Sequence, residues 1–261
     1  MKKVFITRRL PSVAEEILKE KFDIYSSDRN EPYPCDKLKD IVSDYDAVLT
    51  TVSENFDKSI LKKNGRLKVI SNYATGLDNV DVAYARSVGI TVYNTPDAVT
   101  NSTADLTLLI LLSLTRKISL AQKFIKEDRW KAWDPELFLG EELNGKVFGI
   151  LGFGKIGQAV AKRAAGFGMK IIYYNRSKKD GDLNSSLKQY TKSTDLDELL
   201  KTSDYLSIHL PLTDETKGFV NKDLFDRMQK KPIILNMARG DIVNTNDLVE
   251  ALRVGKVRGA G

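Results

Sequence analysis

One arginine stands where an apolar run gives way to a predicted helix, in the stretch "NMARGDIV" at residues 236–243. The run "PIILNMA" predicts a buried strand, and α/β sheets present their ligands at the carboxyl ends of strands. The planar guanidinium of Arg239 could bind a carboxylate through two parallel hydrogen bonds, which a lysine could not form. We therefore expect Arg239 to anchor a substrate; an ion pair with Asp241 is the simpler alternative.

A second segment, residues 152–157, has the spacing G-x-G-x-x-G. It follows a predicted strand at 147–151 and precedes a predicted helix at 159–167 and a further strand at 170–174. In this context Gly152 permits a tight turn, Gly154 lets the backbone approach a pyrophosphate, and Gly157 lets the helix pack closely on the strand. The helix N-terminus then offers N–H groups to phosphate. The pattern predicts a dinucleotide site; the alternative is a glycine-rich turn that binds nothing.

The end of the next strand favours NADP(H). An NAD-specific protein carries Asp or Glu there, which binds the adenine ribose hydroxyls. This chain has Asn175, Arg176, Ser177 and Lys178 instead. Arg176 could bind a 2′-phosphate, with Ser177 donating a hydrogen bond and Lys178 adding charge. We predict a preference for NADP(H), with NAD(H) as the other cofactor that the domain could accept; an ordinary solvated basic turn is the alternative.

Composition excludes several other classes of protein. The 261 residues carry 41 Lys and Arg against 35 Asp and Glu, but the bases are scattered and no nucleic-acid motif occurs, so we expect no nucleic-acid partner. A single cysteine, Cys35, excludes an intrachain disulfide and a cysteine-cluster metal site, and we expect no metal. The longest apolar run, residues 106–114, is too short to span a bilayer, and the first residues do not resemble a secretory signal. We expect a cytoplasmic protein with no membrane partner.

Short β-branched runs alternate with helical periodicity, which predicts α/β units around mainly parallel sheets. Residues 1–98 form one such unit. After a break near Pro96, residues 101–103 offer capping side chains to a long apolar helix that leads into a second domain, residues 99–261. In that domain we expect strands at 147–151, 170–174, near 189–192, 204–209 and 232–236, and a sixth that begins at "KVRGAG".

Four segments, taken in order, resemble the D-isomer-specific 2-hydroxyacid dehydrogenase family, closest to its glyoxylate and hydroxypyruvate reductase branch. They are "NYATGLDNVDVAYARSVGITVYNTPDAVTNSTADL", "GKVFGILGFGKIGQAVAKRAAGFGMKIIYYNRS", "SDYLSIHLPLTDETKGFVN" and "NMARGDIVNTNDLVEALRVGKVRGAG". The resemblance covers essentially the whole chain. It implies a flavodoxin-like substrate domain at 1–98, a Rossmann domain with a doubly wound parallel sheet at 99–261, and a cleft between them. In such enzymes a hydride passes between the nicotinamide and C2 of a small 2-oxo or 2-hydroxy acid.

The resemblance also implies roles for individual residues. The substrate carboxylate would receive backbone N–H groups from Ala74, Thr75 and Gly76, with Val52 and Ser53 at its border. Arg239 would be catalytic, binding both the carboxylate and the keto oxygen. The cofactor would be lined by Thr103, Gly154, Lys155, Ile156, Pro211, Thr216 and Ala238. A homodimer is implied as well, formed through the second domain and the arm around "RWKAWDPELFLG".

Carbonyl reduction also needs a proton, and a positioned histidine is the usual donor. The family places that histidine and its carboxylate partner downstream of the arginine matched by Arg239, in a region that would follow Gly261. We therefore expect a C-terminally incomplete dinucleotide-binding domain and a chain that is part of a longer product. His209, the single histidine, closes a predicted strand and is expected to pack or hydrogen-bond rather than to donate the proton.

Three functions remain in view. The leading one is NADP(H)-dependent reduction of glyoxylate or hydroxypyruvate. The second is a catalytically inert dinucleotide-binding protein that lacks the acid/base pair. The third, phosphoglycerate dehydrogenase activity, is disfavoured because no acidic residue follows Tyr174 at the position typical of NAD-dependent enzymes.

Overall fold

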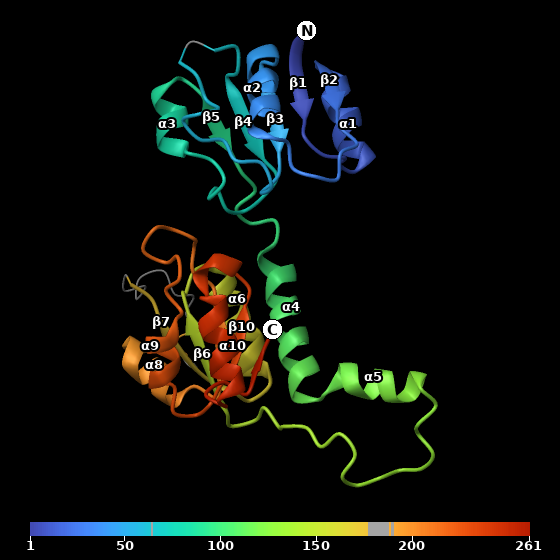
Figure 1. The fold of residues 1–261 in the computed structure, drawn as a ribbon, viewed down its shortest axis with the longest axis vertical. Coiled ribbons are helices and arrows are strands. Elements are labelled where there is room, and N and C mark those ends of the chain that lie inside the picture. The colour runs from blue at the N-terminus through green and yellow to red at the C-terminus, as the bar shows by residue number, and fades with distance from the viewer. Residues whose placement is uncertain (64, 177–187, 189–190) are drawn as a thin grey trace. The chain divides into compact units, whose positions relative to one another are not determined.

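The computed structural model describes residues 1–63, 65–176, 188 and 191–261. The chain divides into two compact units, Met1–Val99 and Thr100–Gly261, and each is described here by itself (Figure 1). Within the described part of the chain, no helix combines the length and the apolar character needed to cross a membrane.

The first unit is built on a five-stranded parallel sheet. Its strands are β1 (Lys2–Ile6), β2 (Phe22–Ser26), β3 (Ala47–Thr50), β4 (Val69–Asn72) and β5 (Thr91–Tyr93), in the order β2-β1-β3-β4-β5. Its helices are α1 (Ser12–Lys19), α2 (Cys35–Asp44) and α3 (Val82–Ser87). This strand order is that of flavodoxin-like folds, in which the carboxyl ends of the central strands carry the ligand loops.

One face of this sheet carries the core of the unit. Leu38, Ile41 and Val42 of α2 are buried against sheet residues such as Val48 and Ile70. The three α2 residues recur at helical spacing, while the sheet residues come from alternating strand positions, so each element buries one side only. Helix α3 is fixed at its start, because the carboxylate of its N-cap residue accepts the third backbone N–H of the helix.

The second unit contains a six-stranded parallel sheet. Its strands are β6 (Val147–Leu151), β7 (Lys170–Tyr174), β8 (Thr191–Ser193), β9 (Tyr205–Ile208), β10 (Ile233–Asn236) and β11 (Gly259–Ala260). The strand order is β11-β10-β9-β6-β7-β8. Taken from the other edge and numbered with β6 as strand 1, it is the 3-2-1-4-5-6 arrangement of Rossmann folds. The α/β fold class with a doubly wound sheet is thus confirmed. All of its strands are parallel, and the topological switch point, where the order of successive strands reverses, lies between β6 and β9.

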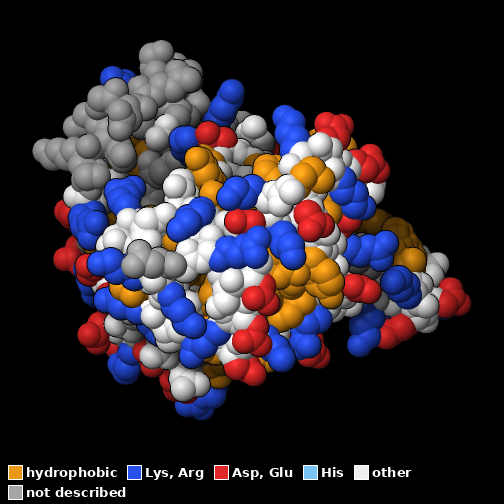
Figure 2. Space-filling model, turned by 90° about the horizontal axis from the view of Figure 1, so that it is seen from above, with side chains coloured by type: hydrophobic (Ala, Val, Ile, Leu, Met, Phe, Trp, Pro, Cys, Tyr) orange, Lys and Arg blue, Asp and Glu red, His pale blue; other side chains and the backbone are white. Residues whose placement is uncertain are grey.

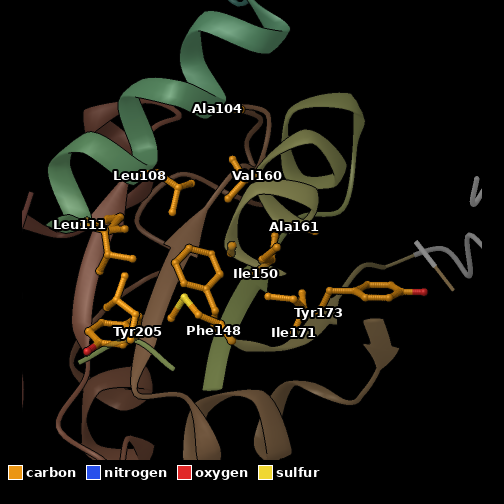
Figure 3. Close-up of a cluster of buried hydrophobic side chains, with 14 of the residues drawn as sticks. Ala104, Leu108, Leu111, Phe148, Ile150, Val160, Ala161, Ile171, Tyr173 and Tyr205 are labelled. Atoms are coloured by element: carbon orange, nitrogen blue, oxygen red, sulfur yellow. The ribbon is translucent and has the colours of Figure 1, made fainter. Parts of the chain in front are cut away.

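Helices cover both faces of the second sheet. They are α4 (Thr100–Thr115), α6 (Lys155–Gly166), α8 (Leu196–Thr202), α9 (Lys222–Arg227) and α10 (Thr245–Arg253), with a 3-10 turn η1 (Gly240–Ile242). Helix α5 (Ile118–Lys126) follows α4 and extends away from the sheet (Figure 1). On one face, Leu108 of α4 and Val160 of α6 pack on Phe148 of β6 (Figure 3). The opposite core includes residues of α8, α9 and α10.

Four expected element boundaries need correction. The helix expected at 159–167 begins earlier, at Lys155, because Gly154 is already its N-cap and the G-x-x-G half of the motif forms the first helical turn. The strand expected near 189–192 is described only from Thr191, as β8; residues 189 and 190 lie outside the described residues. The strands expected at 204–209 and 232–236 are each shorter, since their terminal residues belong to the connecting turns.

Candidate functional site

Two glycines of the loop after β6 are required by the fold itself. Gly152 has a φ of +95°, and a Cβ atom there would come within 2.7 Å of the carbonyl oxygen of His209. A Cβ on Gly157, in the first turn of α6, would collide with the carbonyl oxygen of Gly152. Both positions therefore admit only glycine without a backbone shift, whether or not a ligand binds.

Gly154 is different, because nothing in the chain itself requires a glycine there. Its φ of −77° is open to any residue, and a Cβ atom would meet nothing within 4 Å in the described part of the chain apart from its immediate neighbours along the backbone. It is also the N-cap of the 12-residue helix α6, whose first N–H groups have no intrahelical acceptor. The missing side chain therefore leaves open space beside N–H groups at a positive helix end, which fits the pyrophosphate of a dinucleotide.

The loop is held rigidly to the end of β7. Phe153 is fully buried, and its ring stacks on Tyr173 with centroids 3.8 Å apart. The backbone N–H of Phe153 donates to Oδ1 of Asn175 at 3.1 Å, and the N–H of Gly152 donates to the carbonyl of Tyr174 at 2.9 Å. The side chain of Asn175 thus supports the glycine loop, while Lys155 is exposed and Ile156 half-buried on the first turn of α6.

Arg176 is exposed next to Asn175, and an acidic residue stands near it. The pKa of Glu215 is lowered, first by a hydrogen bond of 2.6 Å from the Thr213 hydroxyl and also by the positive charge of Arg176. The strand end and the turn after β9 therefore lie within electrostatic reach of each other. Ser177 and Lys178, the other two residues expected at the 2′-phosphate, lie outside the described residues.

The turn after β9 brings two further expected cofactor residues together. The hydroxyl of Thr216 donates to the carbonyl of Pro211 at 2.6 Å and accepts the N–H of Thr213 at 2.8 Å. Thr103 lies half-buried in the first turns of α4, where its carbonyl accepts the hydroxyl of Thr107 at 2.8 Å. Helix α4 packs along α6, the helix that carries the glycine loop (Figure 1).

His209 follows β9 and is tied into the sheet. Its Nε2 lies 2.8 Å from the hydroxyl of Ser207, and its Nδ1 is buried with no hydrogen-bond partner among the described residues. Burial lowers its pKa from 6.5 to about 4, because desolvation disfavours the charged ring. At neutral pH the imidazole is therefore uncharged and a poor source of protons.

Arg239 follows β10 in a turn that a neighbouring amide holds. The side chain of Asn236 donates to the carbonyl of Arg239 at 2.9 Å and accepts the N–H of Ala238 at 3.1 Å. The half-buried guanidinium donates to the carbonyl of Ala238 at 3.0 Å. Asp241, the acid considered as its partner, lies 3.7 Å from the ammonium of Lys217.

In the first unit, the expected substrate residues form two neighbouring loops. Val52 and Ser53 are exposed after β3, and Ala74, Thr75 and Gly76 follow β4, which pairs with β3. The N–H of Ala74 is already bonded to the carbonyl of Asn72 at 2.8 Å. The N–H groups of Thr75 and Gly76 have no acceptor among the residues that the structure describes, so both could donate to a ligand.

Three buried polar residues beside these loops were not predicted as functional. Glu54, Asn72 and Asn79 are 1%, 0% and 6% exposed. Their sequence signal is weak: Asn72 ends β4, while Glu54 and Asn79 lie in the segments that follow β3 and β4. Among the described residues, no three His, Cys, Asp or Glu side chains gather closely enough to hold a metal ion.

Charge on the surface is mixed. Figure 2 shows Lys and Arg side chains interspersed with Asp and Glu over the face that it draws. Such a distribution differs from the one-signed stripe that is typical of nucleic-acid binding proteins.

Comparison with known proteins places these features in context. Residues 108–261 match the family model for the D-isomer specific 2-hydroxyacid dehydrogenase, NAD binding domain. The glyoxylate reductase of Pyrococcus furiosus is 41% identical over 263 residues, which cover 99% of this chain and 77% of the relative. The structure of D-lactate dehydrogenase from Aquifex aeolicus with NAD and lactic acid is 27% identical, with a TM-score of 0.85 over 99% of this chain and 75% of that one. An acyclic imino acid reductase in complex with NADPH and D-Arg is 26% identical, with a TM-score of 0.87 over 99% and 81%.

Proposed function

The chain belongs to the D-isomer specific 2-hydroxyacid dehydrogenase family, and from that premise we propose that it reduces glyoxylate or hydroxypyruvate to the 2-hydroxy acid with NADPH. Its relatives establish an NAD(P)-dependent oxidoreductase; the substrate and the choice of cofactor are the proposal. The single observation that carries it is Gly154, a glycine that the fold does not need, beside the N-terminus of α6.

The residues around this glycine would hold the cofactor. The N–H groups at the start of α6 would bind the pyrophosphate, and the Thr216 turn, Thr103 and Ala238 would line the remainder. The bound cofactor supplies the hydride. The chain contributes a loop that cannot shift, since the buried Phe153 ring and the Asn175 amide fix it to β7.

Two residues at the end of β7 support NADPH over NADH. The amide oxygen of Asn175 accepts a hydrogen bond from the backbone N–H of Phe153. A carboxylate at position 175 could accept the same bond, so this contact does not require an uncharged residue. An amide in place of an acid leaves the ribose 2′ position without a negative neighbour there, and Arg176 adds a positive one. The absence of a carboxylate at 175 and the positive charge of Arg176 both favour a 2′-phosphate.

For the substrate we propose two sets of donors. The guanidinium of Arg239 binds the carboxylate and polarises the keto oxygen, which prepares C2 for hydride attack. The N–H groups of Thr75 and Gly76 bind the carboxylate, with Val52 and Ser53 at its border. Reduction also adds one proton to the keto oxygen, and the resemblance assigns this proton to a histidine downstream of the arginine matched by Arg239. His209 is not assigned this role, because its pKa of about 4 leaves it uncharged at neutral pH.

We also propose that the protein forms a homodimer through its arm. Helix α5 and the segment after it expose Leu120, Ile125, Trp130, Trp133 and Leu139, between 55% and 80% each. They adjoin a pocket of about 170 Å³ lined by residues such as Phe124 and Phe138. Exposed clusters of apolar side chains are typical of interfaces between proteins. We propose that the arm of a second copy of this chain covers the cluster.

The test is an assay of cofactor oxidation by the purified protein with glyoxylate, hydroxypyruvate and pyruvate, each with NADPH and NADH. We expect turnover of the first two acids, with a higher kcat/KM for NADPH. Replacing Arg176 by Gln should raise the Kd for NADPH at least about tenfold and leave that for NADH unchanged. NADPH binding without oxidation of NADPH by either acid would contradict the proposed activity, and an unchanged NADPH Kd in Arg176→Gln would contradict the cofactor preference.

A further inference from the structure

Two buried asparagines connect the loops that the proposed function assigns to the substrate. The β3 loop, residues 51–54, carries the exposed pair Val52 and Ser53; the β4 loop, residues 73–78, carries the N–H groups of Thr75 and Gly76. Each loop follows the end of a strand and has few backbone hydrogen bonds of its own. One backbone bond runs from the N–H of Tyr73 to the carbonyl of Thr50 at 2.7 Å, and Asn94 and Thr95 also hydrogen-bond to the β4 loop. The remaining support between the two loops comes from the side chains packed beneath them.

Asn79 closes the base of the β3 loop. Its Nδ2 donates to the carbonyl of Thr51 at 2.9 Å and to the carbonyl of Glu54 at 2.8 Å, which are the first and last residues of that loop. One amide group thus holds both ends of the exposed tip. With Asn79 6% exposed, no water can replace these bonds without a cavity opening.

Asn72 makes the corresponding contacts for the β4 loop. Its Nδ2 donates to the carbonyl of Gly76 at 2.9 Å and to Oδ1 of Asn79 at 3.0 Å. Since Asn72 is fully buried, both of its amide hydrogens are used inside the protein. The two amides form one continuous chain of hydrogen bonds from Thr51 to Gly76.

A buried ion pair supports the β3 loop from its other side. The carboxylate of Glu54 accepts Nη2 of Arg8 at 2.9 Å and the hydroxyls of Thr7, Thr50 and Thr51 at 3.1 to 3.3 Å. Its side chain is 0% exposed, so these contacts satisfy it within the unit. The loop is therefore anchored through the Glu54 carboxylate on one side and the Asn79 amide on the other.

From this arrangement we propose that Asn72 and Asn79 are positioning residues for the substrate: they fix the spacing between the β3 loop and the Thr75 and Gly76 donors. The inference rests on the proposed function of these loops. Donors to a small carboxylate must keep their geometry to within a fraction of an ångström, and buried, fully bonded amides provide that constraint. Neither residue touches the substrate in this proposal.

The test measures binding of oxamate, a 2-oxo acid analogue that cannot be reduced, to the NADPH complex by calorimetry. Variants are Asn79→Ala, Asn72→Ala and the double variant; the control is Leu38→Ala, which opens a cavity in the core of the same unit. We expect each single asparagine variant to raise the oxamate Kd about tenfold while the NADPH Kd stays unchanged. The double variant should add little to either single one, because the amides act as one chain. Leu38→Ala should lower the Tm and leave the oxamate Kd unchanged.

The outcomes separate the two levels of the proposal. If the unaltered protein does not bind oxamate, the proposed function of the loops is wrong. If it binds oxamate and Asn79→Ala binds equally well, the positioning role is wrong, and the same holds if Leu38→Ala weakens oxamate as much. If Asn79→Ala fails to fold, Asn72→Ala takes its place. This variant keeps the two hydrogen bonds that Asn79 donates to the β3 loop. An oxamate Kd equal to that of the unaltered protein would again contradict the positioning role.

Discussion

A Cβ atom on Gly152 would lie 2.7 Å from the carbonyl oxygen of His209, across the switch between β6 and β9. Gly152→Ala should therefore lower the free energy of unfolding by about 2 to 4 kcal/mol, through both the contact and the positive φ. Gly154→Ala should change it by less than about 1 kcal/mol. Thermal unfolding measures both.

Gly154→Ala nevertheless has a predicted effect on the cofactor. Its new methyl group would fill the open space at the start of α6, so we expect the Kd for NADPH to rise at least about tenfold. Titration of protein fluorescence with NADPH measures this. Equal affinity in Gly154→Ala and the unaltered protein would show that no phosphate approaches this residue.

Glu215 should weaken NADPH binding. Its charge lies near enough to Arg176 for each to affect the other, and a 2′-phosphate at Arg176 would meet it. We expect Glu215→Gln to lower the NADPH Kd by about twofold to fivefold at low salt, with a smaller gain at high salt. The NADH Kd is the internal control, because NADH has no 2′-phosphate; an equal change for both cofactors would contradict the reason given.

Arg239→Lys should separate substrate from cofactor. A lysine keeps the charge but loses the second hydrogen bond to the carboxylate, so we expect kcat/KM for glyoxylate to fall about 100-fold. The NADPH Kd should be unchanged. A comparable loss of NADPH affinity would place Arg239 at the cofactor instead, and steady-state kinetics with direct titration distinguish the two.

His209 should make stability depend on pH. Its pKa is about 4 in the folded protein and 6.5 ordinarily, so the unfolded chain takes up the proton first as the pH falls. Stability should be unaffected above 6.5 and decline progressively from there to about 4, by on the order of 3 kcal/mol in total. In His209→Gln this part of the decline should be absent. Urea unfolding at a series of pH values gives the comparison, and parallel curves for the two proteins would contradict the assignment.

The arm provides a test of assembly. Trp133 is 80% exposed, and Trp133→Glu should shift the protein towards the monomer in sedimentation velocity. Val249→Glu, at a residue of α10 that is 58% exposed, is the matched control and should leave the sedimentation coefficient unchanged. A monomeric unaltered protein would refute the homodimer.

Much of this protein follows from local sequence patterns. The glycine spacing at 152–157 and the strand before it predicted a dinucleotide-binding α/β unit, and the apolar run before Arg239 predicted an arginine at a strand end. The doubly wound arrangement was implied by the family resemblance. The glycine spacing and the two strand patterns are local, because turn conformation, strand alternation and helix capping each depend on a few neighbouring residues. The start of α6 was misplaced for the same reason, since nothing local distinguishes a glycine in the turn from one in the first helical turn.

Tertiary structure decided which residues contact and hold one another. Only the fold shows that a side chain could be accommodated at Gly154, and that Asn175 accepts the hydrogen bond of the Phe153 N–H. It also shows that burial makes His209 a weak base. It also joins Asn72 to Asn79 and Glu54 to Arg8, residues whose types suggested turns and surface charge. Burial and hydrogen-bond partners depend on strand pairing between distant segments, and a single sequence does not encode that pairing in any local pattern.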